Sequence, residues 1–582
     1  MDSSVGKPLS FWQRESGLRV TFHGENVAVG GFDIEIFASE DCGGLIPKAG
    51  LVSISTESEA AFEQVATWFL SCLNTHRGFC STMYTNRLLP YRILDLGSGG
   101  LTGKIMLRET QSQIGKYACL SHCWGGHQPL QTTIETLEQH KEEIGWDALP
   151  KTFQDAVTYT RRLTLQYLWI DSLCIIQDDI DDWNTQAAQM AEIYRNGIIT
   201  LSAAASKGPD DGLFVMTRSK HIAVEVPLPS NATGGPKFFT RYPIPHSAGD
   251  HPLLTRGWVL QERLLSPRVL HFGAFEMIWE CMQSYKCECG ASKNTNSWLD
   301  WKTKFHPDML ADCPPKFAAE SWHNLVKDFS GLNLSQMKDV LPAVSGAAKI
   351  IQQKLQSTGL KATYIAGMWY CWFIEDCLWN VSSPTGSRPE EWQGPTFSWA
   401  SIACIKDISY AAHSIFELRF LPEGEFSVRN CPTLHASIKE HSCELKGADE
   451  TGQVASASVL LSGPLMKATL DQDDLIIHGQ VRYFNSQFWP DYDFSIPGDY
   501  QIENGSTLWC LKILSVKQPL KDPIVQDMWF LILRQVGVDG SGQRVFERVG
   551  LLKYRDGYDV KLPVREWFDP KHVEEDATVK II

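Results

Sequence analysis

The sequence has no apolar stretch near its first residue of the kind that directs secretion, because residues 1–17 read MDSSVGKPLSFWQRESG. It also lacks an uncharged apolar run of about 18 residues, the length that crosses a bilayer as a helix. We therefore expect a cytoplasmic protein with no membrane span.

Clusters of basic residues are also missing. The chain has 53 Lys and Arg against 68 Asp and Glu, which gives a formal net charge of −15. Because the phosphate backbone of nucleic acid is bound mainly by dense positive charge, we expect no nucleic-acid partner.

Paired CxxC motifs are absent, and 16 cysteines in 582 residues are too few for a disulfide scaffold. Two partial sets have metal-like spacing: Cys72, His76 and Cys80, and further along Cys281, Cys287 and Cys289. Each set lacks a fourth zinc ligand. We interpret both as structural thiols and assign no metal.

The composition is that of a globular protein, with 43% hydrophobic and 21% charged residues and 20 Trp. A chain of 582 residues exceeds the size of one hydrophobic core, so two or three domains are expected. We place an N-terminal helix and strand lead-in at 1–114, a central domain at 115–275 and a C-terminal α+β region at 276–582.

The central segment alternates apolar strands with amphipathic helices, which predicts an α/β fold with a parallel sheet. Strands are expected at 117–123, 167–170 and 198–204. One helix should begin near Pro150 and another should end at Gly197.

Outside the central segment, the hydrophobic pattern predicts further elements. They are a helix at 58–73, a buried strand at 90–96, helices at 318–330 and 336–355, a β-rich region from about 363, and a flexible insert at 446–458.

Polar residues follow the strands of the central segment. His122, Cys123 and Asp171 all fall at carboxyl ends, where open α/β sheets bind ligands. Asp171 would act there as a base or bind a ribose hydroxyl. The alternative is that Asp171 caps the next turn or pairs with Arg161 or Arg162.

Three blocks carry most of the reactive side chains: YACLSHCWGG at 117–126, YLWIDSLCIIQDDIDDW at 167–183 and TRGWVLQERLLSPRVLHF at 255–272. In order and spacing they resemble the fungal heterokaryon-incompatibility (HET) domain family. The resemblance implies a remote likeness to Toll/interleukin-1 receptor domains, some of which cleave NAD. Some members of the family trigger programmed cell death when genetically different hyphae fuse, and others are encoded beside secondary-metabolite genes.

The cysteines and Ser121 allow two nucleophile hypotheses. Cys174 would pair with His122 if their strands are adjacent, whereas Cys123 points away from its neighbour His122. Ser121, His122 and Asp171 would instead form a hydrolase triad, although the GxSxG elbow is missing. Buried thiols are the alternative that we favour for the cysteines.

Glu262 offers an acid. A buried glutamic acid would serve as the proton donor in cleavage of a glycosyl bond, in line with the NAD-cleaving analogy. The alternative is a structural network in which Arg256, Glu262 and Arg268 neutralise one another.

We predict a HET-domain protein that acts as an effector of non-self recognition and cell death in fungi. The alternatives are an enzyme or accessory protein of secondary-metabolite biosynthesis, and a non-catalytic interaction protein. The candidate catalytic residues are Ser121, His122, Asp171, Cys174 and Glu262. A partner protein, self-association and a small-molecule ligand all fit, and the cofactor is unknown.

Overall fold

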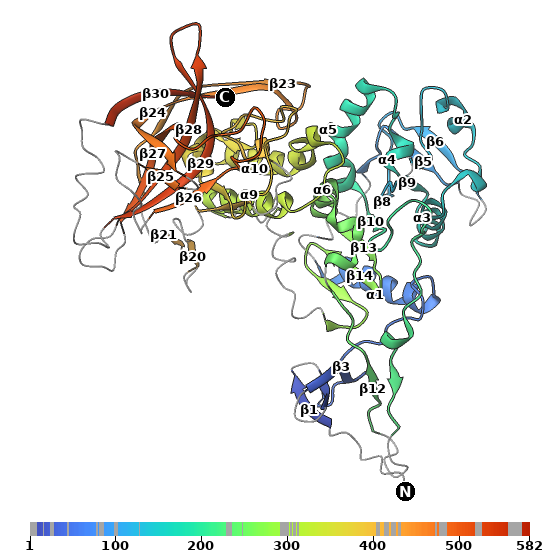
Figure 1. Cartoon of the computed structure of the whole chain (residues 1–582). Helices are drawn as coiled ribbons and strands as arrows, with labels where there is room; N and C mark the ends of the chain where they lie inside the picture. Colours follow the sequence, from blue (N-terminus) through green and yellow to red (C-terminus); the bar gives the residue numbers. More distant parts are fainter. Residues whose placement is uncertain are drawn as a thin grey trace. The chain divides into compact units, whose positions relative to one another are not determined.

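The computed structural model divides the chain into two compact units, Met1–Asp308 and Met309–Ile582, which we describe separately (Figure 1). The structure describes residues 9–14, 17–23, 28–43, 46–76, 80, 87–97, 103–126, 128–227, 235–246, 248–291, 302, 305–306, 310, 313–402, 408–411, 418–420, 426–428, 432–471, 474–476, 486–517, 526–556 and 573–582.

The first unit is built around an eight-stranded sheet. Its strands, in spatial order, are β15 (Tyr285–Cys287), β14 (Met277–Cys281), β13 (Arg268–Phe272), β10 (Ile199–Ser202), β8 (Tyr117–Ser121), β9 (Tyr167–Trp169), β5 (Arg92–Asp95) and β6 (Met106–Glu109). The four central strands β13, β10, β8 and β9 run parallel, and the outer pairings are antiparallel. The sheet is therefore mixed rather than purely parallel, within an α/β fold.

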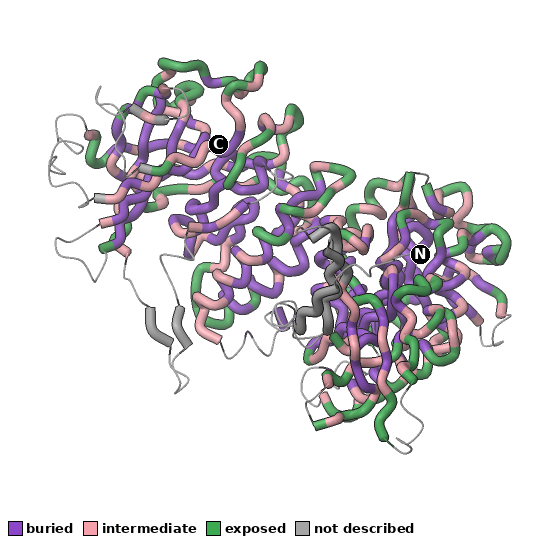
Figure 2. The backbone as a smooth tube through the Cα atoms, turned by 60° about the horizontal axis from the view of Figure 1, so that its bottom comes forward, coloured by how far each residue is buried: buried purple, intermediate pink, exposed green. Residues whose placement is uncertain are grey.

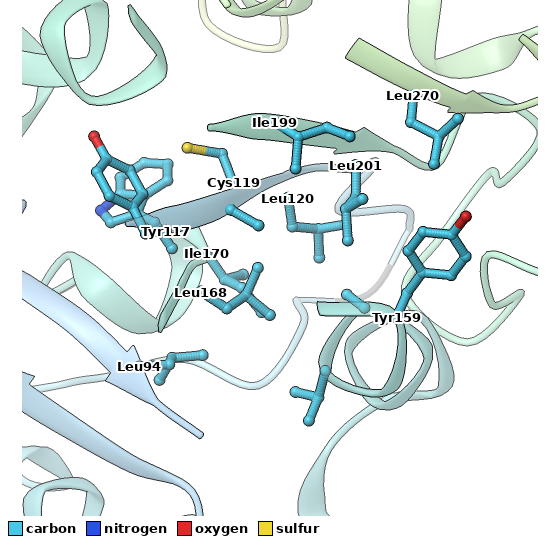
Figure 3. Packing of buried hydrophobic residues seen from close by; sticks show 14 of the residues in the cluster. Leu94, Tyr117, Cys119, Leu120, Tyr159, Leu168, Ile170, Ile199, Leu201 and Leu270 are labelled. Carbon is cyan, nitrogen blue, oxygen red and sulfur yellow. The ribbon is translucent and has the colours of Figure 1, made fainter. Parts of the chain in front are cut away.

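The central strands are buried along their whole length. Every residue of β8, β10 and β13 is buried, which explains their nearly continuous apolar sequences. Leu120, Leu201 and Tyr159 belong to the same hydrophobic core, as Figure 3 shows. The strands predicted at 117–123, 167–170 and 198–204 are confirmed, each ending a little earlier than expected.

Helices on the two faces complete this core. They are α1 (Glu59–Thr75), α2 (Leu137–Glu142), α3 (Lys151–Arg162), α4 (Asp171–Cys174), α5 (Ile180–Asn196) and α6 (Gly257–Leu265). Two predicted end signals are confirmed, since Pro150 precedes α3 and Gly197 follows α5. Ser58 caps α1. The one-turn helix α4 lies directly after β9, in a block predicted only as a strand end.

The eight-stranded sheet extends past both predicted limits of the central domain. Strands β5 and β6 come from the expected lead-in, and the boundary at 275/276 falls between β13 and β14. A second sheet, in the order β1 (Leu9–Arg14), β2 (Gly17–His23), β3 (Ala28–Ala38), β12 (Phe238–Arg241) and β11 (Val224–Glu225), is antiparallel throughout. A small pair joins β4 (Arg87–Leu88) to β7 (Ile114–Gly115).

The second unit combines helices with strands that pair antiparallel, except that β29 (Arg544–Asp556) and β30 (Val573–Ile581) pair in parallel. The helices are α9 (Pro315–Ser330), α10 (Ser345–Ser357) and α11 (Phe373–Asp376), and short pairs link β16 (Tyr364–Ile365) to β17 (Met368–Trp369), β18 (Trp379–Val381) to β19 (Ile408–Tyr410) and β20 (Leu418–Phe420) to β21 (Phe426–Val428). The nine-stranded sheet contains β22 (Thr433–Leu434), β23 (Ser437–Leu445), β24 (Val454–Asp471), β25 (Asp474–Ile476), β26 (Ser486–Pro490), β27 (Thr507–Lys517), β28 (Gln526–Val538), β29 (Arg544–Asp556) and β30 (Val573–Ile581).

Pairings in this sheet run in a closed circuit, because β24 bonds to both β27 and β30. Figure 2 shows how much of these strands is buried. The prediction of a flexible insert at 446–458 is wrong. That segment forms the turn between β23 and β24 and the first residues of β24. Asp449 in the turn accepts a hydrogen bond from Ser345 of α10 (2.6 Å).

Among the described residues, no helix combines the length and the apolar character needed to cross a bilayer.

Candidate active site

The adjacent parallel strands β8 and β9 bring two of the three sequence blocks together at their carboxyl ends. Ser121 is the last residue of β8 and His122 follows it, while Asp171 comes two residues after β9. Successive residues of a strand point to opposite faces of the sheet. His122 lies on the face of α3, with its ring 4.9 Å from that of Phe153, and Ser121 faces α5 and α6.

On the α3 face, His122 and Asp171 form a buried pair. Nε2 of His122 is 3.1 Å from Oδ1 of Asp171, and Nδ1 is 3.2 Å from the main-chain oxygen of Cys123. Both neighbours are hydrogen-bond acceptors. The imidazole ring is therefore held between two acceptors, which fixes its orientation beside the carboxylate.

The Asp171 carboxylate is held by two further donors. Trp124 Nε1 donates to Oδ2 (2.9 Å) and the Ser172 main-chain N–H donates to Oδ1 (2.7 Å). Burial acts to raise the pKa of Asp171, but the charge of His122 and these hydrogen bonds outweigh it and lower the pKa below its usual value. The Asp171 side chain is 23% exposed, whereas that of His122 is 1% exposed. Asp171 is thus the solvent-facing member of the pair.

On the opposite face, the carboxyl of Glu262 lies on α6 beside Ser121 and the phenol of Tyr194 from α5. Burial raises the pKa of Glu262 to about 7, and the charge of Asp171 adds to that effect. The Ser121 and Tyr194 hydroxyls and the charge of Arg256 act in the other direction. Glu262 is only 7% exposed, and its Oε2 is buried without a hydrogen-bond partner.

The structure does not form either nucleophile arrangement considered from the sequence. Cys174 is fully buried with its pKa raised to about 12 by burial, and the ring nitrogens of His122 contact Asp171 and Cys123 instead. The Ser121 hydroxyl lies beside Glu262, and the ring nitrogens of His122 contact Cys123 and Asp171 instead, so Ser121 and His122 make no triad. Cys174 reads as a core thiol.

The structure forms only part of the arginine contacts that we considered from the sequence for Glu262 and Asp171. Arg256 donates to the main-chain oxygen of His122 (2.9 Å), and Arg268 donates to those of Ile198 and Cys80 rather than to Glu262. Arg161 donates to main-chain oxygens, and Arg162 pairs with Glu59. Neither of these last two neutralises Asp171.

Sequence reasoning missed a second polar chain in the same sheet. Ser202 Oγ lies 3.0 Å from Nδ1 of His271, whose Nε2 is 3.3 Å from Oε2 of Glu280. Arg263 and Lys302 neutralise Glu280. Ser202, His271, Glu280 and Lys302 are buried and the Arg263 side chain is only 12% exposed. Burial lowers the pKa of His271 to about 4, so this chain of contacts is a structural network. The sequence feature that could have indicated this network is the alternation of polar and apolar residues along β10, β13 and β14.

The cysteines regroup relative to the sequence prediction. Cys281 lies with Cys72, His76 and Cys80, whereas Cys287 and Cys289 lie with His246 and Glu276. Placing Cys281 with the later pair was therefore wrong, and each set has four potential ligands rather than three. The missing members lie far away in the sequence.

Comparison with known proteins agrees with the sequence blocks. The family model of the heterokaryon incompatibility protein (HET) matches residues 117–262, which span β8 to α6. The chain is also 26% identical over 117 residues to oncosphere antigen A of Hydatigena taeniaeformis, a match that covers 20% of this chain and 35% of that protein. The chain therefore spans about a third of the length of that curated relative. No solved structure matches the chain.

Residues 117–262 contribute both parallel strands of the site, the His122–Asp171 pair and Glu262 on α6. The chain accordingly carries, at residues 117–262, a domain of the heterokaryon incompatibility (HET) family.

Proposed function

We propose that this chain is an effector of fungal non-self recognition whose HET domain cleaves a glycosyl bond of a small metabolite and thereby causes cell death. One observation carries the proposal: two carboxyl groups near the same sheet edge have pKa values moved in opposite directions. Asp171 is held ionised, and Glu262 has a pKa of about 7. Such a separation gives the two carboxyl groups different roles, one as a permanent charge stabiliser and the other as a group that exchanges a proton near neutral pH.

The chemistry follows from these states. The electrons of the broken glycosyl bond pass to the nitrogen of a cationic leaving base, which departs neutral and needs no proton. Near neutral pH, part of the Glu262 population is ionised and accepts a proton from the water that adds to the sugar carbon. The Asp171 carboxylate, oriented by His122 and Trp124, stabilises the positive charge that develops on the sugar or binds its hydroxyl. NAD is the metabolite that we propose, and the remote likeness to Toll/interleukin-1 receptor domains belongs to this proposal. The four parallel strands are compatible with that likeness.

Glu262 is closed to solvent in the isolated chain, which bears on regulation. Because the exposed fraction of Glu262 is only 7%, a substrate reaches this acid only after α6 shifts. A closed site of this kind is expected of an effector that stays inactive until a partner binds or copies of the chain associate. We therefore expect little turnover by the resting chain.

The test is inducible expression of the full chain in a filamentous fungus, with viability scored for the wild type, Asp171→Asn and Glu262→Gln. Both variants keep the side-chain shape and should abolish toxicity. Glu192→Gln, on the exposed side of α5, is the matched control and should remain toxic. Nicotinamide release in the induced cells should rise only with the toxic chains.

Other outcomes separate the alternatives. Toxicity that survives in both Asp171→Asn and Glu262→Gln would show a non-catalytic interaction protein. An inert chain whose deletion removes a secondary metabolite would show a role in biosynthesis instead.

A further inference from the structure

The β14–β15 hairpin at the edge of the large sheet has a cluster of potential metal ligands at each end. Cys281 ends β14 at the turn, and Glu276, Cys287 and Cys289 lie at the open end. We name these groups the turn cluster (Cys72, His76, Cys80 and Cys281) and the base cluster (His246, Glu276, Cys287 and Cys289).

Three segments supply the turn cluster. Cys72 lies in the last turn of α1, His76 is the residue after its end, and Cys80 follows on a turn. Cys281 Sγ is 3.4 Å from Nδ1 of His76 and 3.2 Å from the hydroxyl of Ser284. The three thiols are fully buried.

The base cluster has equally close contacts. Nε2 of His246 lies 2.9 Å from Oε1 of Glu276 and 3.3 Å from Sγ of Cys289. The sulfurs of Cys287 and Cys289 are 3.2 Å apart. Glu276 Oε2 accepts the main-chain N–H of Cys289 (2.6 Å), which orients the carboxylate and leaves Oε1 facing the cluster.

We propose that each cluster binds one Zn²⁺, so that the hairpin is fixed by a Cys₃His site at its turn and a Cys₂HisGlu site at its base. Within each cluster, all four ligand atoms lie within 4.8 Å of one another. A tetrahedral zinc with Zn–S bonds of about 2.3 Å separates two sulfurs by about 3.8 Å, so both clusters are near the required size.

The surroundings of the clusters fit bound zinc. Three thiolates and one imidazole around Zn²⁺ have a net charge of −1. The buried Arg268, which donates to the main-chain oxygen of Cys80 (2.6 Å), lies beside the turn cluster and offsets that charge. The Ser284 hydroxyl lies within reach of the Cys281 sulfur. Such outer contacts orient and stabilise zinc ligands.

Neither a disulfide nor plain core thiols explain the clusters as well. A disulfide bond is about 2.05 Å long, and all the cysteines involved are free in the structure. Burying thiols and the Glu276 carboxyl together, against a half-buried imidazole, is costly unless a cation or proton compensates the polar groups. Since all four positions are filled by protein ligands, both sites would be structural and not catalytic.

The first experiment measures zinc in the full chain, purified without chelators or a histidine tag, by plasma mass spectrometry. The wild type should contain two zinc ions per chain. Cys281→Ser and Cys289→Ser should each retain one, and Cys119→Ala, which removes a buried thiol of β8 outside both clusters, should retain two.

A second measurement needs no variant, so it stands if a cysteine variant fails to fold. Cys72, Cys80, Cys281, Cys287 and Cys289 should resist alkylation in the native chain and react after a strong zinc chelator is added. Wild-type protein with less than half an equivalent of zinc overturns the proposal, as does detection of disulfides among these cysteines. One equivalent that only Cys281→Ser removes would overturn the base site.

Discussion

The imidazole of His122 lies 3.1 Å from the carboxylate of Asp171, and the two residues follow two neighbouring parallel strands of the mixed sheet. Asp171→Asn removes the negative charge that faces the nearly buried ring of His122. Breaking such a pair costs about 3 kcal/mol of stability. Hydrogen exchange of the β8 amides should report the loss, because it follows opening of this unit alone.

Trp124→Phe is the matched control for that measurement. It removes one hydrogen bond to the same carboxylate and keeps the aromatic ring, so it should cost about 1 kcal/mol. Equal losses for Asp171→Asn and Trp124→Phe would contradict an ion pair.

Glu262 should make the stability of the HET domain depend on pH. Its pKa is about 7 in the folded chain and near 4.5 when unfolded, so the folded state binds the proton more tightly. The stabilisation is fully present below pH 4.5, decreases as the pH rises, and is lost above about pH 7. The total change is on the order of 3 kcal/mol.

Glu262→Gln stays neutral and should lack this component. Opening free energies of α6 at pH 5, 6, 7 and 8 give the comparison, and the wild type should lose stability relative to the variant across that range. A difference that does not change with pH would show that Glu262 is ionised in the folded chain.

Arg548 in the second unit depends on Asp491. Both side chains are fully buried, with Arg548 Nε 3.2 Å from Asp491 Oδ2, and the guanidinium also donates to the main-chain oxygens of Cys377 and Trp379. Asp491→Ala leaves a buried charge unpaired and should cost about 3–5 kcal/mol, measured by hydrogen exchange of β29. Glu574→Gln breaks the more exposed pair with Arg544 and should cost less than about 1 kcal/mol.

Asp449 should keep the β23–β24 turn ordered. Its carboxylate accepts hydrogen bonds from Ser345 (2.6 Å), Lys349 (2.9 Å) and the main-chain N–H of Thr451 (3.0 Å). Asp449→Ala should cost about 2 kcal/mol locally and make residues 446–453 sensitive to limited proteolysis. Asp493→Ala, in an exposed turn, should leave that cleavage rate unchanged.

The central strands were predictable because burial on both faces requires nearly continuous apolar sequences, as in YACLS and ITLS. The strand-end rule also placed His122 and Asp171 at one edge. The rule could not show that Asp171, rather than Ser121 or Cys174, contacts the imidazole of His122. That depends on the direction of side chains beyond the ends of the strands.

The cysteine clusters and the order of the segment 446–458 could not be predicted, because both depend on contacts between residues that are distant in the sequence. The spacing of Cys72, His76 and Cys80 does not indicate a fourth ligand more than 200 residues later. Cys281 reaches these residues because β14 packs against α1. The segment 446–458 has a loop-like composition, yet the contacts of Asp449 with α10 order it. Composition does not record such tertiary contacts.

The position of the HET match within the sheet limits which fragment can fold by itself. A chain cut to residues 117–262 would keep β10, β8 and β9 but lose β13 on one side and β5 on the other. The edges of β10 and β9, which are paired in the full domain, would then be open to other chains, and such open edges promote aggregation. The smallest soluble fragment of this domain should therefore begin before Arg92 and continue beyond Cys289.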